Sequence, residues 1–79
     1  MSSYDYYGEA KRLAVELESA GFSSFATAIL NTMLEGGTGT EILMMMRLEL
    51  SCMIDVGNLP VGLKERAIVL HEKIDDALS

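Results

Sequence analysis

Hydrophobic side chains recur along the chain at intervals of three and four residues, the spacing of one face of an α-helix. The clearest example follows Pro60, where the apolar positions are Leu63, Ala67, Leu70, Ile74 and Leu78. Most charged residues of this segment fall off the apolar stripe. Pro60 suits the first turn, because its missing N–H would have no partner there. The pattern predicts an amphipathic helix over this last segment.

A similar pattern predicts a first helix that ends at Gly21. Its apolar face comprises Ala10, Leu13, Ala14, Leu17 and Ala20. Ser2 or Ser3 can cap this helix, and Asp5 would then lie in its positive first turn. Gly21 supplies the left-handed residue that commonly closes a helix.

A second helix is predicted to start at Ser23 or Ser24, either of which can cap it. Its expected apolar face comprises Phe22, Phe25, Ala26, Ile29, Leu30, Met33 and Leu34. No charge occurs between Ser24 and Leu34, so we expect this helix to be well covered. The short connection at Gly21 and Phe22 predicts an antiparallel hairpin with the first helix.

The third segment, residues 38–56, is the most apolar part of the chain. Thr38 and Glu41 have the spacing of a capping box at its start. Between Ile42 and Ile54 only Arg47 and Glu49 are charged. A helix that is apolar most of the way round has to be covered on several sides. We therefore predict an all-α fold, a compact four-helix bundle with a central apolar third helix and a single domain over residues 1–79.

The charge balance narrows the choice of partners. Lys and Arg total 6 and Asp and Glu total 12, which gives a formal charge of −6. This excess of carboxylates disfavours nucleic acid and anionic membrane surfaces, because both attract positive charge. It suits a basic protein partner. The third segment is also too short and too charged, at Arg47 and Glu49, to span a bilayer.

Cys52 is the only cysteine, so one chain has no disulfide framework. Within such an apolar stretch we expect it to be a small buried hydrophobic residue. A single free cysteine fits a reducing, cytoplasmic location. The first nine residues lack the basic start and apolar run of a signal peptide.

The sequence motifs that could indicate catalysis or ligand binding are weak. The glycine-rich run 36–40 precedes a helix, but it has no lysine and is followed by Glu41, so we interpret it as a turn. His71 and Asp75 are one turn apart and could share a metal only with a third ligand from elsewhere. The carboxylate pairs are adjacent or two residues apart, and no nucleophile has an obvious base. We predict no enzymatic activity, no cofactor and no metal site.

The residues that we expect to contact a partner form two groups. The first is acidic and lies on the last helix: Glu65, Glu72, Asp75 and Asp76. The second is the aromatic start of the chain, Tyr4, Tyr6 and Tyr7, since tyrosine is favoured at interfaces. Packing of these rings onto the bundle is the alternative.

Three consecutive methionines occur at positions 44–46. Successive helical residues point about 100° apart, so the three cannot all face one neighbour. Methionine fills irregular core gaps and also serves adaptable binding surfaces. Core packing is one reading, and a homodimer that pairs through Met44 and Met45 is the other.

Two stretches carry a resemblance: GGTGTEILMMMR from Gly36, and RLAVELESAGF from Arg12. Together they resemble a family of short uncharacterised bacterial helical proteins with a Gly-Thr-Gly-Thr-Glu-Ile-Leu-Met segment. The resemblance implies four helices and a bacterial source, and it implies no catalytic residue.

These features favour a non-enzymatic protein that binds another protein. Its small size and acidic charge suit a bacterial toxin inhibitor of the immunity-protein or antitoxin type, facing a basic surface. Two alternatives stay open from the sequence. One is a self-associating helical module, and the other is a bundle that binds a metal or ligand through His71 and Asp75.

Overall fold

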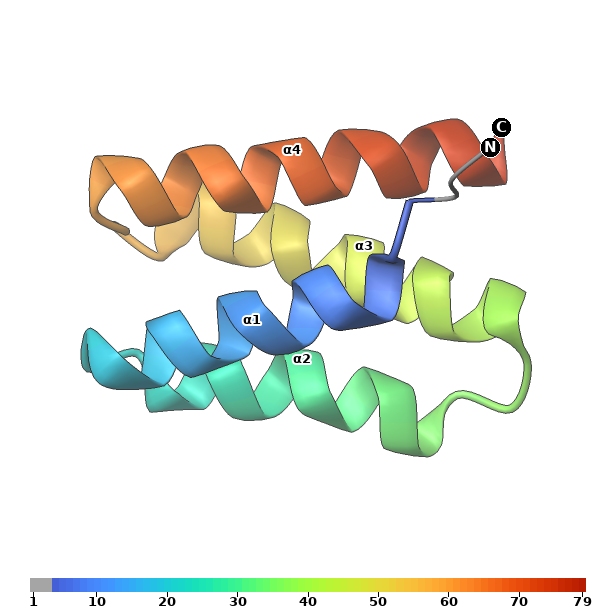
Figure 1. Cartoon of the computed structure of the whole chain (residues 1–79), viewed down its shortest axis with the longest axis horizontal. Coiled ribbons are helices and arrows are strands. Elements are labelled where there is room, and N and C mark those ends of the chain that lie inside the picture. The colour runs from blue at the N-terminus through green and yellow to red at the C-terminus, as the bar shows by residue number, and fades with distance from the viewer. Residues whose placement is uncertain (1–3) are drawn as a thin grey trace.

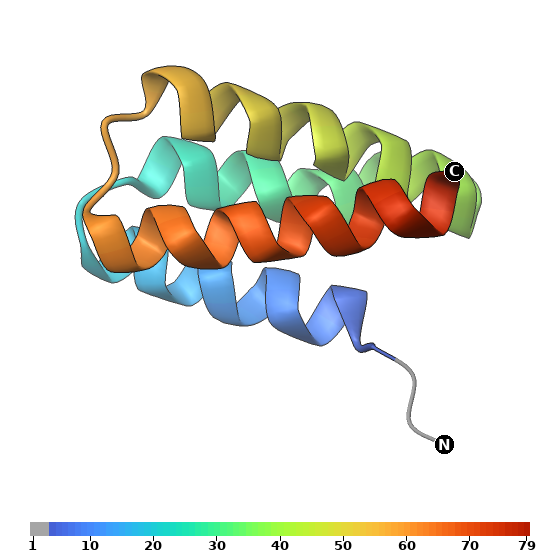
Figure 2. The ribbon, with the colours of Figure 1, turned by 90° about the horizontal axis from the view of Figure 1, so that it is seen from above.

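Four helices make up the part of the chain that the computed structural model describes, residues 4–79 without the side chain of Val56. They are α1 (Tyr6–Ser19), α2 (Ser23–Glu35), α3 (Gly39–Val56) and α4 (Val61–Leu78). Each helix runs antiparallel to the one before it (Figure 1). Each also packs against the next along the chain, and α4 closes the ring against α1 (Figure 2). The prediction of an all-α four-helix bundle is confirmed.

Local hydrogen bonds explain both ends of α1. Asp5 lies just before the helix, and its Oδ1 accepts from the N–H of Gly8 at 3.0 Å. At the other end Gly21 has φ +93°, and its N–H donates to the Glu18 carbonyl at 3.1 Å. The N–H of Phe22 donates to the Leu17 carbonyl at 2.8 Å, which completes a Schellman motif. The predicted role of Gly21 is confirmed. The prediction that Asp5 lies in the first turn is wrong, because Asp5 is itself the N-cap of α1. The proposed caps Ser2 and Ser3 lie outside the described residues.

For the starts of the later three helices, only some of the predictions made from the sequence are confirmed. The prediction that Ser23 or Ser24 caps α2 is wrong, because the Schellman motif places Phe22 at the cap, where no side chain accepts a hydrogen bond. For α3 the cap is confirmed: Thr38 Oγ1 accepts from the Glu41 N–H at 3.2 Å. Pro60 lies one residue before α4, at its cap position rather than in its first turn.

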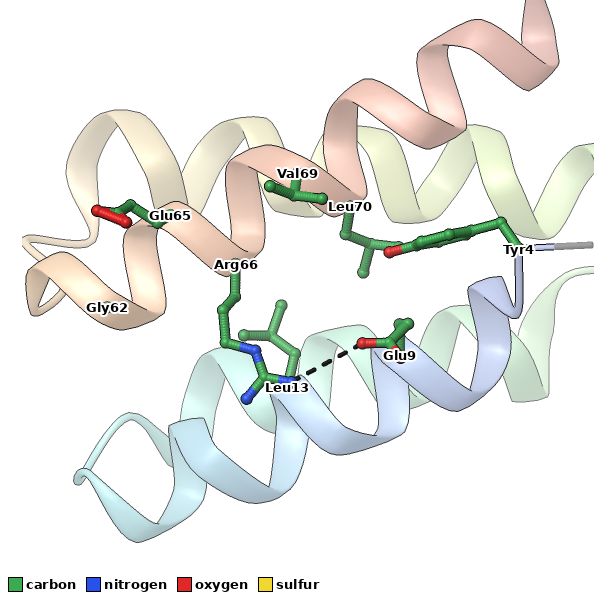
Figure 3. Close-up of a pocket in the computed structure, with 8 residues that line it drawn as sticks. All are labelled: Tyr4, Glu9, Leu13, Gly62, Glu65, Arg66, Val69 and Leu70. Atoms are coloured by element: carbon green, nitrogen blue, oxygen red, sulfur yellow. Dashed lines mark ion pairs between the residues drawn. The ribbon is translucent and has the colours of Figure 1, made fainter.

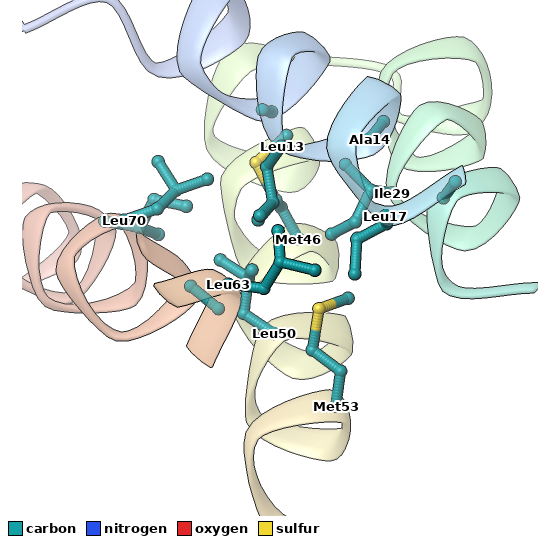
Figure 4. Packing of buried hydrophobic residues seen from close by; sticks show 13 residues of the cluster. Leu13, Ala14, Leu17, Ile29, Met46, Leu50, Met53, Leu63 and Leu70 are labelled. Carbon is teal, nitrogen blue, oxygen red and sulfur yellow. The ribbon is translucent and has the colours of Figure 1, made fainter. Parts of the chain in front are cut away.

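The core lies along the axis of the bundle, and all the helices contribute to it (Figure 4). From α1 come the predicted Ala10, Leu13, Ala14 and Leu17, and from α4 the predicted Leu63, Ala67, Leu70 and Ile74. The remaining buried hydrophobic residues are Ala26, Ile29, Met46, Leu50 and Met53. The apolar stripes of the four helices therefore pack against one another in one core.

The position of α3 differs from the predicted central one. It packs against α2 and α4 and lies diagonally across the bundle from α1, so it occupies a corner. Its outer side is open to solvent, with Met44 47% exposed, Leu48 72% exposed and Cys52 also exposed. Because the sequence of α3 is apolar almost throughout, its periodicity does not reveal which side faces outward. In a ring of four helices each helix has a solvent-facing side, so none is enclosed.

The apolar face predicted for α2 is also not fully buried. Leu34, which was predicted to lie on the apolar face, is largely exposed, and Leu30 is partly exposed. Thr32 is buried instead, because its hydroxyl donates to the Ile29 carbonyl at 2.7 Å and so needs no water. Ala20, predicted on the inner face of α1, is exposed beyond the end of that helix.

Glycine allows α2 and α3 to approach closely at one end of their contact. A Cβ atom at position 57 would lie 2.8 Å from Cε2 of Phe25, closer than carbon atoms pack. A Cβ atom there would also clash with the carbonyl oxygen of Met53, so glycine is needed between the end of α3 and Phe25. Among residues 4–79, none of the helices combines the length and the apolar character needed to cross a bilayer.

Two leucines on α3 allow the orientation of this helix to be tested. Leu50 is fully buried, whereas Leu48, two residues earlier, is exposed. We expect Leu50→Ala to lower the free energy of unfolding by about 2–5 kcal/mol, because it removes a core side chain and leaves a cavity. Leu48→Ala, the matched control, should change it by less than about 0.5 kcal/mol. Urea unfolding at low micromolar protein measures both, and similar losses in the two variants would contradict the described rotation of α3.

Candidate functional site

The outward side of α4 carries a line of carboxylates. Glu65, Glu72 and Asp76 are seven and four residues apart, so they project from the same side of the helix over about 16 Å. All three are exposed, and among the described residues none of them forms an ion pair. Val69, 48% exposed, lies between Glu65 and Glu72 on this side. We call these four residues the acidic face of α4.

Two of the basic side chains beside this face, those of Arg66 and Lys73, are turned toward α1 and Tyr4. Arg66 reaches α1, where its guanidinium pairs with Glu16 and lies 3.8 Å from a carboxylate oxygen of Glu9. The ammonium group of Lys73 lies 5.5 Å from the ring centroid of Tyr4. Neither cation forms an ion pair with Glu65, Glu72 or Asp76.

Asp75 is the exception among the acidic residues predicted from the sequence. Its Oδ1 lies 2.8 Å from Nη1 of Arg47 on α3. Asp75 therefore faces α3, and its charge is compensated within the molecule. Of the four predicted acidic residues, three lie together on the acidic face of α4 and Asp75 lies beside it.

A shallow groove between α1 and α4 borders the acidic face (Figure 3). Its volume is about 240 Å³, and Arg66 crosses it from α4 toward α1 with Tyr4 at its other end (Figure 3). The lining residues are Tyr4, Glu9, Leu13, Gly62, Glu65, Arg66, Val69 and Leu70. Leucine side chains and Val69 make the lining partly apolar, and carboxylates lie at its edges. Of these two carboxylates Glu9 is paired with Arg12 and Arg66, so Glu65 is the one that can attract a cation of a partner.

The surroundings of Tyr4 affect its ionisation. Partial burial raises the pKa of its phenol above 10.0, and the negative charge of Glu9 and the nearby Tyr6 raise the pKa further. Arg66 acts in the opposite direction. The ring of Tyr6 meets that of Tyr4 edge to face, with centroids 5.0 Å apart. Both rings are partly buried against the core, whereas Tyr7 is partly exposed.

The methionine cluster is divided between core and surface. Met46 is fully buried, Met45 is partly buried and Met44 is exposed. Cys52 lies two turns after Met44 on the same side of α3 and is exposed. The prediction that this thiol is buried is wrong, because the buried stripe of α3 runs through Leu50 and Met53.

The residues considered for chemistry do not come together as a site. Ser51 Oγ and His71 Nε2 are 3.5 Å apart, which is a weak contact, and Asp75 is held by Arg47. Within residues 4–79, no three potential ligands among His, Cys, Asp and Glu lie close enough to share a metal ion. The glycine-rich turn leads into α3, where the N–H of Glu41 already bonds to Thr38.

Two features of the site were not found from the sequence. The ion pairs of Arg66 join residues 50 and more positions apart, and no local pattern identifies such partners. The exposed line of Met44, Leu48 and Cys52 has a visible four-residue spacing, but the apolar residues around it conceal that signal.

Fold and surface together define a class: a small helical bundle with a line of carboxylates on the outward side of α4 and a shallow groove beside it. No protein-family model, curated protein or solved structure matches the chain. The resemblance carried by Gly36–Arg47 therefore stays an expectation.

Ionisation of Tyr4 gives a prediction about pH. A raised pKa means that the folded chain favours the neutral phenol, so the stabilisation is complete below pH 10.0 and is lost as the pH rises through the raised pKa. We expect the ultraviolet difference titration between wild type and Tyr4→Phe to have its midpoint above 10.0. A midpoint at or below that value would show that Tyr4 is not packed against α4 as described.

Proposed function

We propose that this protein binds a basic segment of another protein along the acidic face of α4, and that it has no enzymatic activity of its own. The observation that supports this most is the outward line of Glu65, Glu72 and Asp76, with no ion pair to any of them in the described part of the chain. Carboxylates that are not neutralised internally attract cationic groups of a partner.

The composition of the face also suits protein recognition. Val69 offers an apolar contact between two of the carboxylates, and the groove beside it is lined by Leu13 and Leu70. An apolar contact surrounded by polar groups is the usual arrangement of an interface. A lysine or arginine of the partner can lay its apolar stem along Val69 and place its charge near Glu65 or Glu72.

Long-range attraction adds to these contacts. With a formal charge of −6, the chain attracts a basic protein before contact and so raises the rate of association. This attraction extends over about 8 Å at physiological ionic strength and weakens as salt is added. We therefore expect the association rate, more than the dissociation rate, to depend on salt.

Within this class we propose a toxin inhibitor of the immunity-protein or antitoxin type, from a bacterial cytoplasm. Such an inhibitor acts by covering a basic surface of its target, which requires binding and no catalytic group. The exposed, single thiol of Cys52 fits a reducing compartment, where it would not be oxidised.

Two double variants test this proposal. Glu65→Gln with Glu72→Gln removes charge from the acidic face, whereas Glu18→Gln with Glu35→Gln removes the same charge from exposed sites on α1 and at the end of α2. Immobilised wild-type protein is used to capture a partner from extracts of the host, and the partner is then identified and purified. We expect the first double variant to bind it roughly tenfold or more weakly and the second to bind almost as well as wild type.

The same comparison can contradict the proposal in two ways. One is the recovery of no protein partner by the wild type at either low or moderate salt. The other is an equal loss of affinity in both double variants, which would show that net charge alone matters and that α4 is not the binding face.

A further inference from the structure

The acidic face of α4 has the residue spacing at which one helix packs against another. Gly62 precedes this face, and Glu65, Val69, Glu72 and Asp76 follow at intervals of three, four, three and four residues. Residues with this alternation lie along one nearly straight line, where a second helix can contact all of them. All five are exposed, so the line is open to a partner over its whole length. We call these five residues the outer seam of α4.

Neither the backbone nor the packing of the fold requires a glycine at position 62. Gly62 lies in the first turn of α4, and its φ is not positive. A Cβ atom built on it would meet no heavy atom within 4 Å. Within a helix, glycine lowers stability relative to residues with a side chain. What a glycine on an exposed helix surface provides is room for the backbone of a partner to approach closely.

We propose that the partner segment bound by the acidic face of α4 is a basic helix that lies along the outer seam. This inference rests on the function proposed above and specifies the form of the partner. The helix is basic because the three carboxylates of the seam form no ion pair among the described residues. It carries one apolar residue among its cations, because Val69, 48% exposed, lies between Glu65 and Glu72.

The distances between the carboxylates favour a helix over an extended segment. Along the axis of α4, Glu65 and Glu72 are about 10.5 Å apart, and Glu72 and Asp76 are about 6 Å apart. A partner helix repeats both distances on one of its faces, with residues seven and four positions apart. In an extended segment a step of about 10.5 Å takes about three residues, and residues three apart point to opposite faces. A helix therefore directs all its cations at the seam.

The groove between α1 and α4 offers the partner helix a second contact (Figure 3). Val69 and Leu70 line this groove from α4, and Leu13 lines it from α1. The apolar residue of the partner that meets Val69 can extend toward these leucines and leave water. Gly62 and Glu65 also line the groove, so the helix covers part of it while its cations meet the seam. Affinity should therefore depend on the shape of the partner as well as on its charge.

Titration calorimetry with synthetic peptides tests the form of the partner. The probe is a capped, alanine-based helix of about 18 residues, with three lysines and one leucine spaced to match the seam in either direction. Its control has one central Ala→Pro, which keeps every charge and prevents the helix. We expect the helical probe, in one of its two directions, to bind roughly tenfold or more tightly than the control.

The outcomes separate this inference from the function on which it rests. Equal binding of the helical and proline peptides, or no binding of either, would overturn the helical form of the partner and leave the acidic face as a site for another basic segment. Binding of the helical probe that is unchanged by Glu65→Gln with Glu72→Gln would show that the acidic face is not used, which contradicts the proposed function as well.

Gly62→Gln tests the close approach at the end of the seam. Glutamine is neutral and favours a helix, so we expect a higher urea midpoint of unfolding together with roughly fivefold or more weaker binding of the helical probe. Asn31→Gln is the matched control, because Asn31 is exposed on α2 and also becomes a better helix former. The control should bind the probe like wild type. Unchanged affinity in Gly62→Gln, an equal loss in both variants, or a lower urea midpoint of Gly62→Gln would overturn the role of Gly62.

Discussion

Burial of one apolar stripe from each helix is the constraint on which the other features of this structure depend. Leu13, Ile29, Leu50 and Ile74 come from four different helices and meet in one core, and each is almost completely shielded from water. Because a helix has a fixed angle between successive residues, burying this stripe also determines which residues of that helix face outward. The core therefore determines at the same time that the acidic face of α4 and the side of α3 with Met44 and Leu48 face solvent.

The sequence predicts the stripes of α1 and α4 well, because polar residues separate the apolar positions there. It also predicts Gly21 and Thr38, whose roles depend only on local backbone chemistry. Prediction from the sequence fails where polar residues do not clearly separate the apolar positions. In α3 the apolar residues surround the helix, so periodicity does not reveal that Leu48 and Cys52 face solvent. Cross-helix pairs such as Arg66 with Glu16 depend on which helices are neighbours, and that is a property of the whole bundle.

The same packing separates the charges of the molecule. Arg66 and Arg47 form ion pairs across helix boundaries, with α1 and α4 respectively. Exposed pairs of this kind contribute roughly 0.2–1 kcal/mol each, so their main effect is on where charge remains at the surface. Carboxylates remain on the outward side of α4 and, as Glu41 and Asp55, near the two ends of α3, whereas the exposed residues of α2 before Glu35 are uncharged. One small bundle thus presents an acidic side along α4 and an uncharged side along α2.

Methionine oxidation tests the orientation of α3 most directly, since Met44, Met46 and Met53 lie at different angles on this one helix. Brief treatment of the dilute native protein with hydrogen peroxide, followed by peptide mass spectrometry, reports the accessibility of each sulfur. The structure predicts fast oxidation of Met44 and protection of Met46 and Met53 until the chain unfolds. Oxidation of Met46 or Met53 as fast as that of Met44 would contradict the core, and with it both faces that the core defines.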